Sequence, residues 1–237
     1  MTHLSDLRVL PIFTSPARWR VPVKRAIVMV VFLAVVGFVV RAFPADASLS
    51  ATLNVLHIGA LGALCTAVYT VFEPVPAILL TVVITGIVLA RTRQLQVAAA
   101  FAGVVALTWL PSAALKIIVG RPRPHGLTHP FVPAQVDASF PSGHVVFVTA
   151  LLLAALMLIA DRRRRRLAAL LGAVGVVAVA TALCIDGVHW PADVVASVLW
   201  ALAVAPAARL LWVDVVLRRA AARLEQTGRH RSGDSRR

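Results

Sequence analysis

The sequence predicts an all-α, polytopic membrane protein built as a bundle of six transmembrane helices. Two observations support this fold class. Of the 237 residues, 59% are hydrophobic and only 14% are charged, with a mean hydropathy of +0.86, and a soluble protein of this size cannot bury so much apolar surface. In addition, the chain contains several apolar runs of about 20 residues, the length that crosses a bilayer as a helix.

The first apolar run covers residues 26–40 and follows a short basic segment, so we expect a retained anchor and not a cleaved signal peptide. Residues 51–90 are mainly apolar but are interrupted by FEPVP, and they form either two short spans or one span preceded by a helix at the membrane surface. The later spans are expected at residues 95–117, 143–160, 167–186 and 193–211.

The basic residues decide between these topologies, because cytoplasmic loops are enriched in Lys and Arg. If residues 51–90 cross once, both termini are cytoplasmic and 20 of the 24 basic residues lie on the cytoplasmic side. If they cross twice, the division is 16 against 8. We therefore expect six spans, with a cytoplasmic segment at 1–25, a membrane domain at 26–212 and a disordered, basic cytoplasmic tail at 213–237.

The net charge of +14 has the same origin. The basic residues are not interleaved with aromatic residues and form no basic helix face, so we expect membrane lipids and not nucleic acid as partners. Cys65 and Cys184 lie in apolar segments, and no disulfide is expected.

Four basic residues remain on the outer side of the six-span topology, and three of them cluster within eight positions at the end of one span. Positive charge on the face that normally lacks it indicates a functional site. The four residues are Arg41, Lys116, Arg121 and Arg123.

The motif PSGH, residues 141–144, ends the same outer loop. The apolar run after it is expected to be helical, so Ser142 and Gly143 lie at a helix N-terminus, where free backbone N–H groups and the helix dipole bind anions. Lys116 and Arg123 can neutralise phosphate oxygens there. The alternative is an ordinary helix cap with arginines that reach lipid head groups, and these residues alone do not decide between the two.

A second polar motif, GVHWPAD at 187–193, favours the phosphate site. Pro191 suits the first position of the last helix, which places His189 just before this helix and Asp193 in its first turn. A carboxylate that binds one imidazole nitrogen makes the other a better nucleophile or base. A His–Asp pair on the same face as His144 is therefore expected to be catalytic.

Together these motifs resemble those of the type 2 phosphatidic acid phosphatase (PAP2) superfamily of membrane lipid phosphatases. The resemblance rests on Lys116 and Arg123 separated by six residues, on PSGH, and on His189 with Asp193 four positions on, and it covers residues 95–212. PSGH alone is a weak match, but the three blocks in order on one face of a six-span chain are specific.

The resemblance implies hydrolysis of a lipid phosphate or diphosphate, polyprenyl or glycerolipid, in the outer leaflet of the cell membrane. His189 would attack phosphorus and form a phosphohistidine, Asp193 would orient it, and His144 would protonate the leaving group. The scheme requires no metal and no cofactor. The groups implied to bind the phosphoryl oxygens are Lys116, Arg123, Ser142 and Gly143.

The third motif departs from the family pattern, which has Ser-Arg where this chain has Ala182 and Leu183. The missing arginine would be a phosphate ligand, and its loss is expected to lower the rate about 10²–10³-fold. Asp186 adds a negative charge nearby, and Arg121 is a candidate substitute because it lies close to Arg123 in the sequence. The alternative function is therefore a weak or inactive relative that binds phosphorylated lipids.

Other functions fit the sequence less well. A transporter would carry charges near the middle of the membrane, whereas Lys116, Arg123 and Glu73 map to span ends. Haloperoxidases share the phosphate-pocket chemistry but are soluble. His125 and His129 have the spacing of a helical zinc pair, but the prolines and the glycine around them argue against a helix.

Overall fold

The computed structural model describes residues 10–16, 18–133, 135–220 and 223, and its regular structure in these residues is entirely helical. The fold is all-α and polytopic, as the sequence predicts. In chain order the elements are η1 (Pro11–Phe13), α2 (Arg20–Ala42), α3 (Ala47–Asn54), α4 (Gly59–Val71), α5 (Pro74–Thr92), α6 (Leu95–Trp109), α7 (Ser112–Val119), α8 (Gly143–Leu156), α9 (Arg162–Ile185), α10 (Pro191–Arg209) and the π-helical η2 (Leu210–Leu217).

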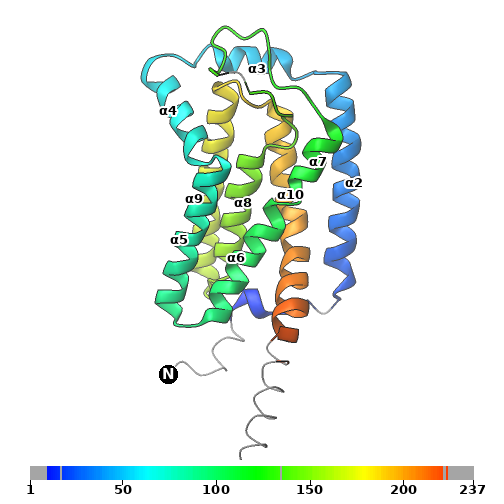
Figure 1. Cartoon of the computed structure of the whole chain (residues 1–237), viewed down its shortest axis with the longest axis vertical. Coiled ribbons are helices and arrows are strands. Elements are labelled where there is room, and N and C mark those ends of the chain that lie inside the picture. The colour runs from blue at the N-terminus through cyan, green and yellow to red at the C-terminus, as the bar shows by residue number, and fades with distance from the viewer. Residues whose placement is uncertain (1–9, 17, 134, 221–222, 224–237) are drawn as a thin grey trace, which may run out of the picture.

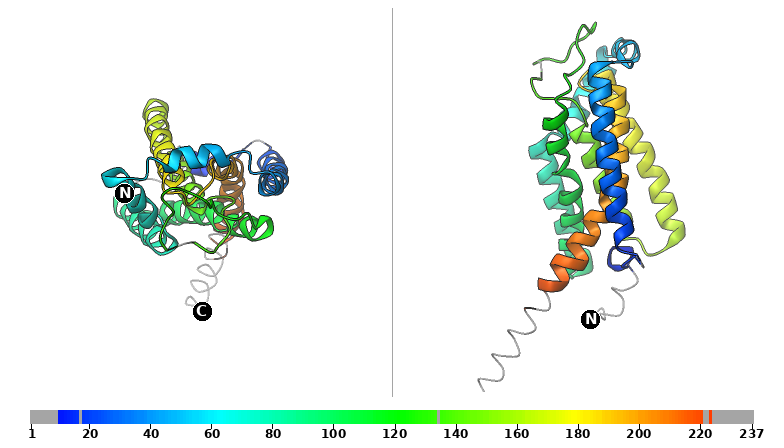
Figure 2. Two further views of the ribbon diagram at one scale, coloured as in Figure 1. Left: turned by 90° about the horizontal axis from the view of Figure 1, so that it is seen from above. Right: turned by 90° about the vertical axis from the view of Figure 1, so that its right-hand side faces the viewer.

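The long helices run side by side along the long axis of the molecule (Figure 1). α3 lies across one end of this bundle, and the loop 120–142 covers the same end (Figures 1 and 2). We name this the α3 end. η1 and η2 lie at the opposite end (Figure 1).

Residues 47–92 pass once from the α3 end to the opposite end (Figure 1). α3 and α4 are bent against each other by 119°. α4 then leads into α5, which begins at Pro74, a residue suited to the first helical position because it has no N–H to leave unpaired. The path is that of the single-span alternative, with a helix at the surface before it.

Five helical segments among the described residues are long and apolar enough to cross a bilayer. The sixth predicted span is α8, which has only 14 residues and packs against α6, α9 and α10. Neighbouring helices surround α8, so its length need not match the bilayer. The five long segments are Arg20–Ala42, Pro74–Thr92, Leu95–Val119, Arg162–Ile185 and Pro191–Ala220.

η1 shows why α8 ends at Leu156 and not near residue 160, where the sequence predicts its end. Ile12 is fully buried in the core cluster that includes Phe147 and Val213, and its N–H donates to the carbonyl of Met157 at 2.9 Å. Residues 10–13 of the predicted cytoplasmic segment thus contribute to the core, which the sequence did not predict.

The helix that ends the bundle also continues past the predicted boundary at residue 212. η2 extends it to Leu217, and Val213 is buried. Residues 213–220 of the segment predicted to be a disordered tail, 213–237, are therefore helical, whereas residues 221–222 and 224–237 lie outside the described residues.

Candidate active site

Three segments meet at the α3 end and bring the predicted site residues together. They are the loop 120–142 with the end of α7, the start of α8, and the turn between α9 and α10 (Figure 1). α8 and α10 both begin here, so the positive ends of two helix dipoles lie beside the site.

His189 lies in the tight turn that joins α9 to α10. Gly187 has a φ of +73°, a conformation that glycine adopts without steric cost, and a Cβ there would lie 2.4 Å from Leu127 Cδ1. The N–H groups of Val188 and His189 donate to the carbonyl of Leu183 at 3.2 and 3.4 Å. The turn therefore fixes the position of the imidazole.

The imidazole of His189 is fully buried, and among the described residues neither ring nitrogen makes a hydrogen bond of good geometry, although the backbone of Ser139 lies close to it. Burial lowers the pKa of His189 well below its ordinary value, and the positive charges of Arg123 and Lys116 lower this pKa further. The ring is therefore neutral at physiological pH, the state that a nucleophile requires.

Asp193 lies in the first turn of α10, beside this ring. Its Oδ2 accepts a hydrogen bond from the N–H of Trp190 at 3.0 Å and lies 3.6 Å from His189 Nδ1. This separation is longer than a hydrogen bond. The structure thus places the carboxylate next to the imidazole, as the sequence predicts, without a direct bond between them.

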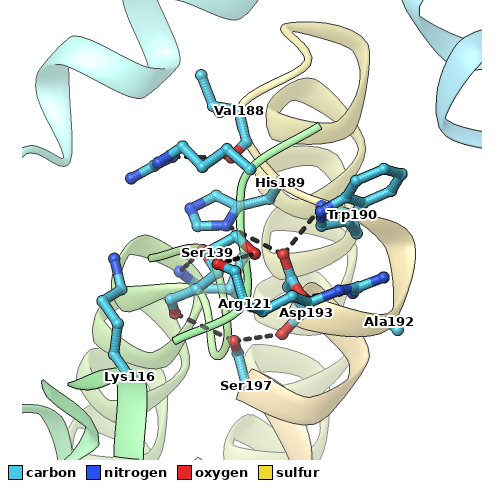
Figure 3. A network of polar contacts seen from close by, with 12 residues as sticks. Lys116, Arg121, Ser139, Val188, His189, Trp190, Ala192, Asp193 and Ser197 are labelled. Carbon is cyan, nitrogen blue, oxygen red and sulfur yellow. Dashed lines mark hydrogen bonds and ion pairs between the residues drawn. The ribbon is translucent and has the colours of Figure 1, made fainter. Parts of the chain in front are cut away.

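Arg121 holds Asp193 from the other side (Figure 3). Its Nη1 donates to Asp193 Oδ1 at 2.7 Å, and the guanidinium also pairs with Asp46, the residue that precedes α3. It lies over the indole of Trp190 at 4.8 Å, and only 1% of its side chain is exposed. Arg121 therefore does not replace the missing family arginine, an alternative that the sequence left open.

Lys116 and Arg123 are joined by Asp137, a residue that the sequence analysis did not select. Lys116 Nζ donates to Asp137 Oδ2 at 2.8 Å, and Arg123 donates to Asp137 Oδ1 from Nη2 at 2.7 Å and from Nε at 3.0 Å. Partial burial opposes ionisation, but the hydrogen bond and charge of Lys116, with the charge of Arg123, lower the pKa of Asp137 to about 2. Its carboxylate is therefore ionised.

His144 lies in the first turn of α8, and its ring centroid is 6.0 Å from that of His189. Ser142 is the N-cap residue of α8, and its side chain accepts a hydrogen bond from the N–H of Val145 at 3.4 Å. Ser142 and Gly143 thus lie at a helix N-terminus, as the PSGH motif predicts.

A cavity of about 450 Å³ opens beside Gly143 and His144, whereas the fully buried Ser142, His189 and Asp193 do not line it. Its polar lining includes Lys116, Arg123 and His144, together with Asp137 and Glu73. The remaining lining is mainly apolar and comes from the α4–α5 junction, α6 and α7, with Tyr69, Phe72, Pro74, Ile78, Trp109, Leu110 and Ala113.

Leu183, at the position of the family arginine, does not line this cavity. Its side chain is fully buried in an apolar cluster with Tyr69, Val145 and Val188. Among the described residues, the cations that line the cavity are Lys116 and Arg123.

Asp186, which the sequence indicated as an unfavourable charge, is paired elsewhere. It lies 2.8 Å from Nε2 of His57 and accepts a hydrogen bond from Thr66 at 2.7 Å. His125 packs edge-on against the ring of Trp190, and no group of three His, Cys, Asp or Glu side chains in the described ranges is arranged to hold a metal.

Comparison with known proteins identifies the family. A family model described as the PAP2 superfamily matches residues 96–216, just over half of the 237 residues. The chain belongs to the PAP2 superfamily. All the predicted catalytic and phosphate-binding residues of this PAP2 protein lie inside the matched range, whereas Asp46, the second partner of Arg121, lies outside it.

A solved structure shares the fold. It is described as the first transmembrane PAP2-type phosphatidylglycerolphosphate phosphatase from Bacillus subtilis, and it matches with a TM-score of 0.67 and 16% sequence identity. The match covers 81% of this chain and 97% of that chain. No curated protein matches the sequence.

Proposed function

We propose that this PAP2 protein hydrolyses a lipid phosphate or diphosphate, polyprenyl or glycerolipid, through a phosphohistidine at His189. The observation that carries the proposal is the cavity that holds Lys116, Arg123 and His144 and is otherwise lined mainly by apolar side chains. This combination fits a ligand with an anionic head and an apolar chain. The family and the fold shared with a lipid phosphatase support the same reaction.

His189 is the nucleophile in this reaction. Asp193 lies 3.6 Å from Nδ1, so a proton on Nδ1 points to the carboxylate and Nε2 carries the free lone pair. Nε2 attacks phosphorus, and the bond between phosphorus and the lipid oxygen breaks.

His144 is the general acid and base. It gives its proton to the departing lipid oxygen, and in the second step it takes a proton from the water that attacks the phosphohistidine. The centroids of the two histidine rings lie 6.0 Å apart, so both rings are close to a phosphoryl group bound by Lys116 and Arg123. Lys116, Arg123 and the N-terminus of α8 stabilise the negative charge on the phosphoryl oxygens.

We further propose that the α3 end faces the extracytoplasmic side of the cell membrane, with both termini in the cytoplasm. Two features support this orientation. The arginine run 162–166 and Arg209 lie at or near the helix ends opposite to the α3 end, as the positive-inside rule requires. The site is then open to lipids of the outer leaflet.

A second candidate function is the binding of phosphorylated lipids without efficient turnover. The observation that favours it is Leu183, because an apolar cluster occupies the position of a family phosphate ligand. Binding would still use Lys116 and Arg123, but the transition state would lack one charge-assisted contact.

Phosphate release from lipids in mixed micelles separates the two functions. The panel contains polyprenyl phosphate, polyprenyl diphosphate, phosphatidic acid and phosphatidylglycerophosphate, with wild type, His189→Ala and Leu183→Arg. We expect wild type to turn over at least one lipid and His189→Ala to lose the activity by at least 10³-fold. If wild type releases phosphate from no lipid and Leu183→Arg does, the result would instead support the lipid-binding function.

A further inference from the structure

Asp137 occupies the donors that a phosphate needs. Its two carboxylate oxygens bind Lys116 and Arg123 separately, at 2.8 Å to Nζ and 2.7 Å to Nη2. The Nε–Nη2 edge of Arg123 is used by Asp137, and Nη1 donates to the carbonyl of Val188 at 2.7 Å. A phosphate can therefore take the bidentate edge of Arg123 only after Asp137 has left it.

Asp137 is able to leave. Half of its side chain is exposed, at 51%, and it lines the same cavity as Lys116, Arg123 and His144. The described residues 135–138 have no backbone–backbone hydrogen bond, and the carbonyl of Asp137 accepts only a long hydrogen bond, of 3.3 Å, from Arg123 Nε. The contrast is Ser139, whose N–H donates to the carbonyl of Arg121 at 2.8 Å and so fixes the next residue along the chain.

We propose that Asp137 is a specificity-determining residue: its carboxylate competes with the ligand for Lys116 and Arg123, so that phosphate monoesters and diphosphates enter and phosphodiester lipids are excluded. A phosphate monoester carries about −1.5 to −2 charges at pH 7, whereas a phosphodiester and a carboxylate carry one each. A tethered carboxylate therefore outcompetes the diester and yields to the monoester. The proposal rests on the lipid phosphatase activity proposed above.

A site at a membrane needs this discrimination because phosphodiester lipids compete for it. A site that opens into a membrane is surrounded by phosphodiester head groups at high concentration, and two free cations beside an apolar cavity would bind them. Asp137 supplies the same single charge from within the chain. Asp137 accepts the hydrogen bonds of Lys116 and Arg123 until a more highly charged head group replaces its carboxylate.

The test is the binding of inorganic phosphate to the full-length protein in detergent micelles, measured by calorimetry for wild type and Asp137→Asn. Asparagine keeps the shape of the side chain and removes its charge. We expect Asp137→Asn to bind phosphate about tenfold more tightly, because the ligand no longer has to displace charge-assisted hydrogen bonds. The matched control is Asp161→Asn, which removes an acid from the N-cap of α9 and should bind as wild type does.

A second measurement tests whether phosphodiester lipids are excluded from the site. Phosphatidylglycerol, a phosphodiester, should inhibit phosphate binding to Asp137→Asn and leave wild type unaffected. Weaker or unchanged phosphate binding by Asp137→Asn would overturn the proposal and would mean that Asp137 positions Lys116 and Arg123. Tighter binding in a protein that hydrolyses no lipid would uphold Asp137 as the competitor and refute the proposed activity. Absence of phosphate binding in all three proteins would overturn both.

Discussion

The four basic side chains at the α3 end divide into two groups: two of them bind other parts of the protein, and two line the cavity. Arg41 donates to the carbonyl of Val119 at 2.7 Å, and Arg121 lies between Asp46 and Asp193, so both stabilise the protein framework. Lys116 and Arg123 line the cavity instead. The excess of positive charge on this face therefore has a structural part and a ligand-binding part.

Arg121→Leu should reduce both stability and turnover. Asp46 and Asp193 would lose their cation, and breaking a buried ion pair costs about 3–5 kcal/mol. We expect kcat to fall at least tenfold with KM nearly unchanged, because Arg121 positions Asp193 and does not line the cavity. Arg121→Lys, which keeps the charge but not the planar fork, should restore part of kcat. Steady-state kinetics and thermal unfolding in micelles measure these changes.

The control for this variant is Arg41→Leu, which removes an outer cation whose hydrogen bond goes to a backbone carbonyl. Its kcat should stay within about twofold of wild type. A loss in Arg121→Leu that appears only in KM would contradict the positioning role.

Among the helices, α6 packs closely against η2 at Gly103. A Cβ on Gly103 would lie 2.0 Å from Trp212 Nε1, and this indole donates to the carbonyl of Ala99 at 2.7 Å. The ring cannot move away without losing that hydrogen bond. The contact fixes the position of η2, which contains Trp212, against α6.

Gly103→Ala should therefore destabilise the bundle by about 1–3 kcal/mol, the usual cost of overpacking. Gly175→Ala is the matched control, because it lies within α9 and a Cβ there meets no atom within 4 Å. Alanine favours a helix over glycine by about 0.5–1 kcal/mol, so the control should be neutral or stabilising. The midpoint of thermal unfolding in one detergent measures both, and equal midpoints for the two variants would contradict the packing argument.

Local signals let the sequence predict most helices. Hydropathy located the apolar segments, and serine or proline at the helix start marked α8 and α10. The early end of α8 was not predictable, because it depends on Ile12, which is distant in sequence. The surface position of α3 depends likewise on its contacts with α9 and with the start of α10.

In the molecule as a whole, the bundle brings the N-terminus of α8 and two cations to one cavity. The site residues could be predicted because each motif is short: PSGH gives the cap, and His189 and Asp193 are four positions apart. The partners Asp46 and Asp137 were not predicted, since they lie 75 and 14 residues from the arginines that they bind. A signal for Asp137 did exist, because it is the only acidic residue between positions 119 and 142.

The most direct test of the proposed function is to trap the covalent intermediate. Full-length protein in micelles is mixed with a phosphorus-labelled lipid from the panel that it hydrolyses, quenched within milliseconds and digested for mass spectrometry. We predict an acid-labile phosphate on His189 that is absent from His189→Ala, and that both forms and breaks down more slowly in His144→Ala, which lacks the acid of the first step and the base of the second. A labelled residue other than His189, or full turnover by His189→Ala, would contradict the mechanism.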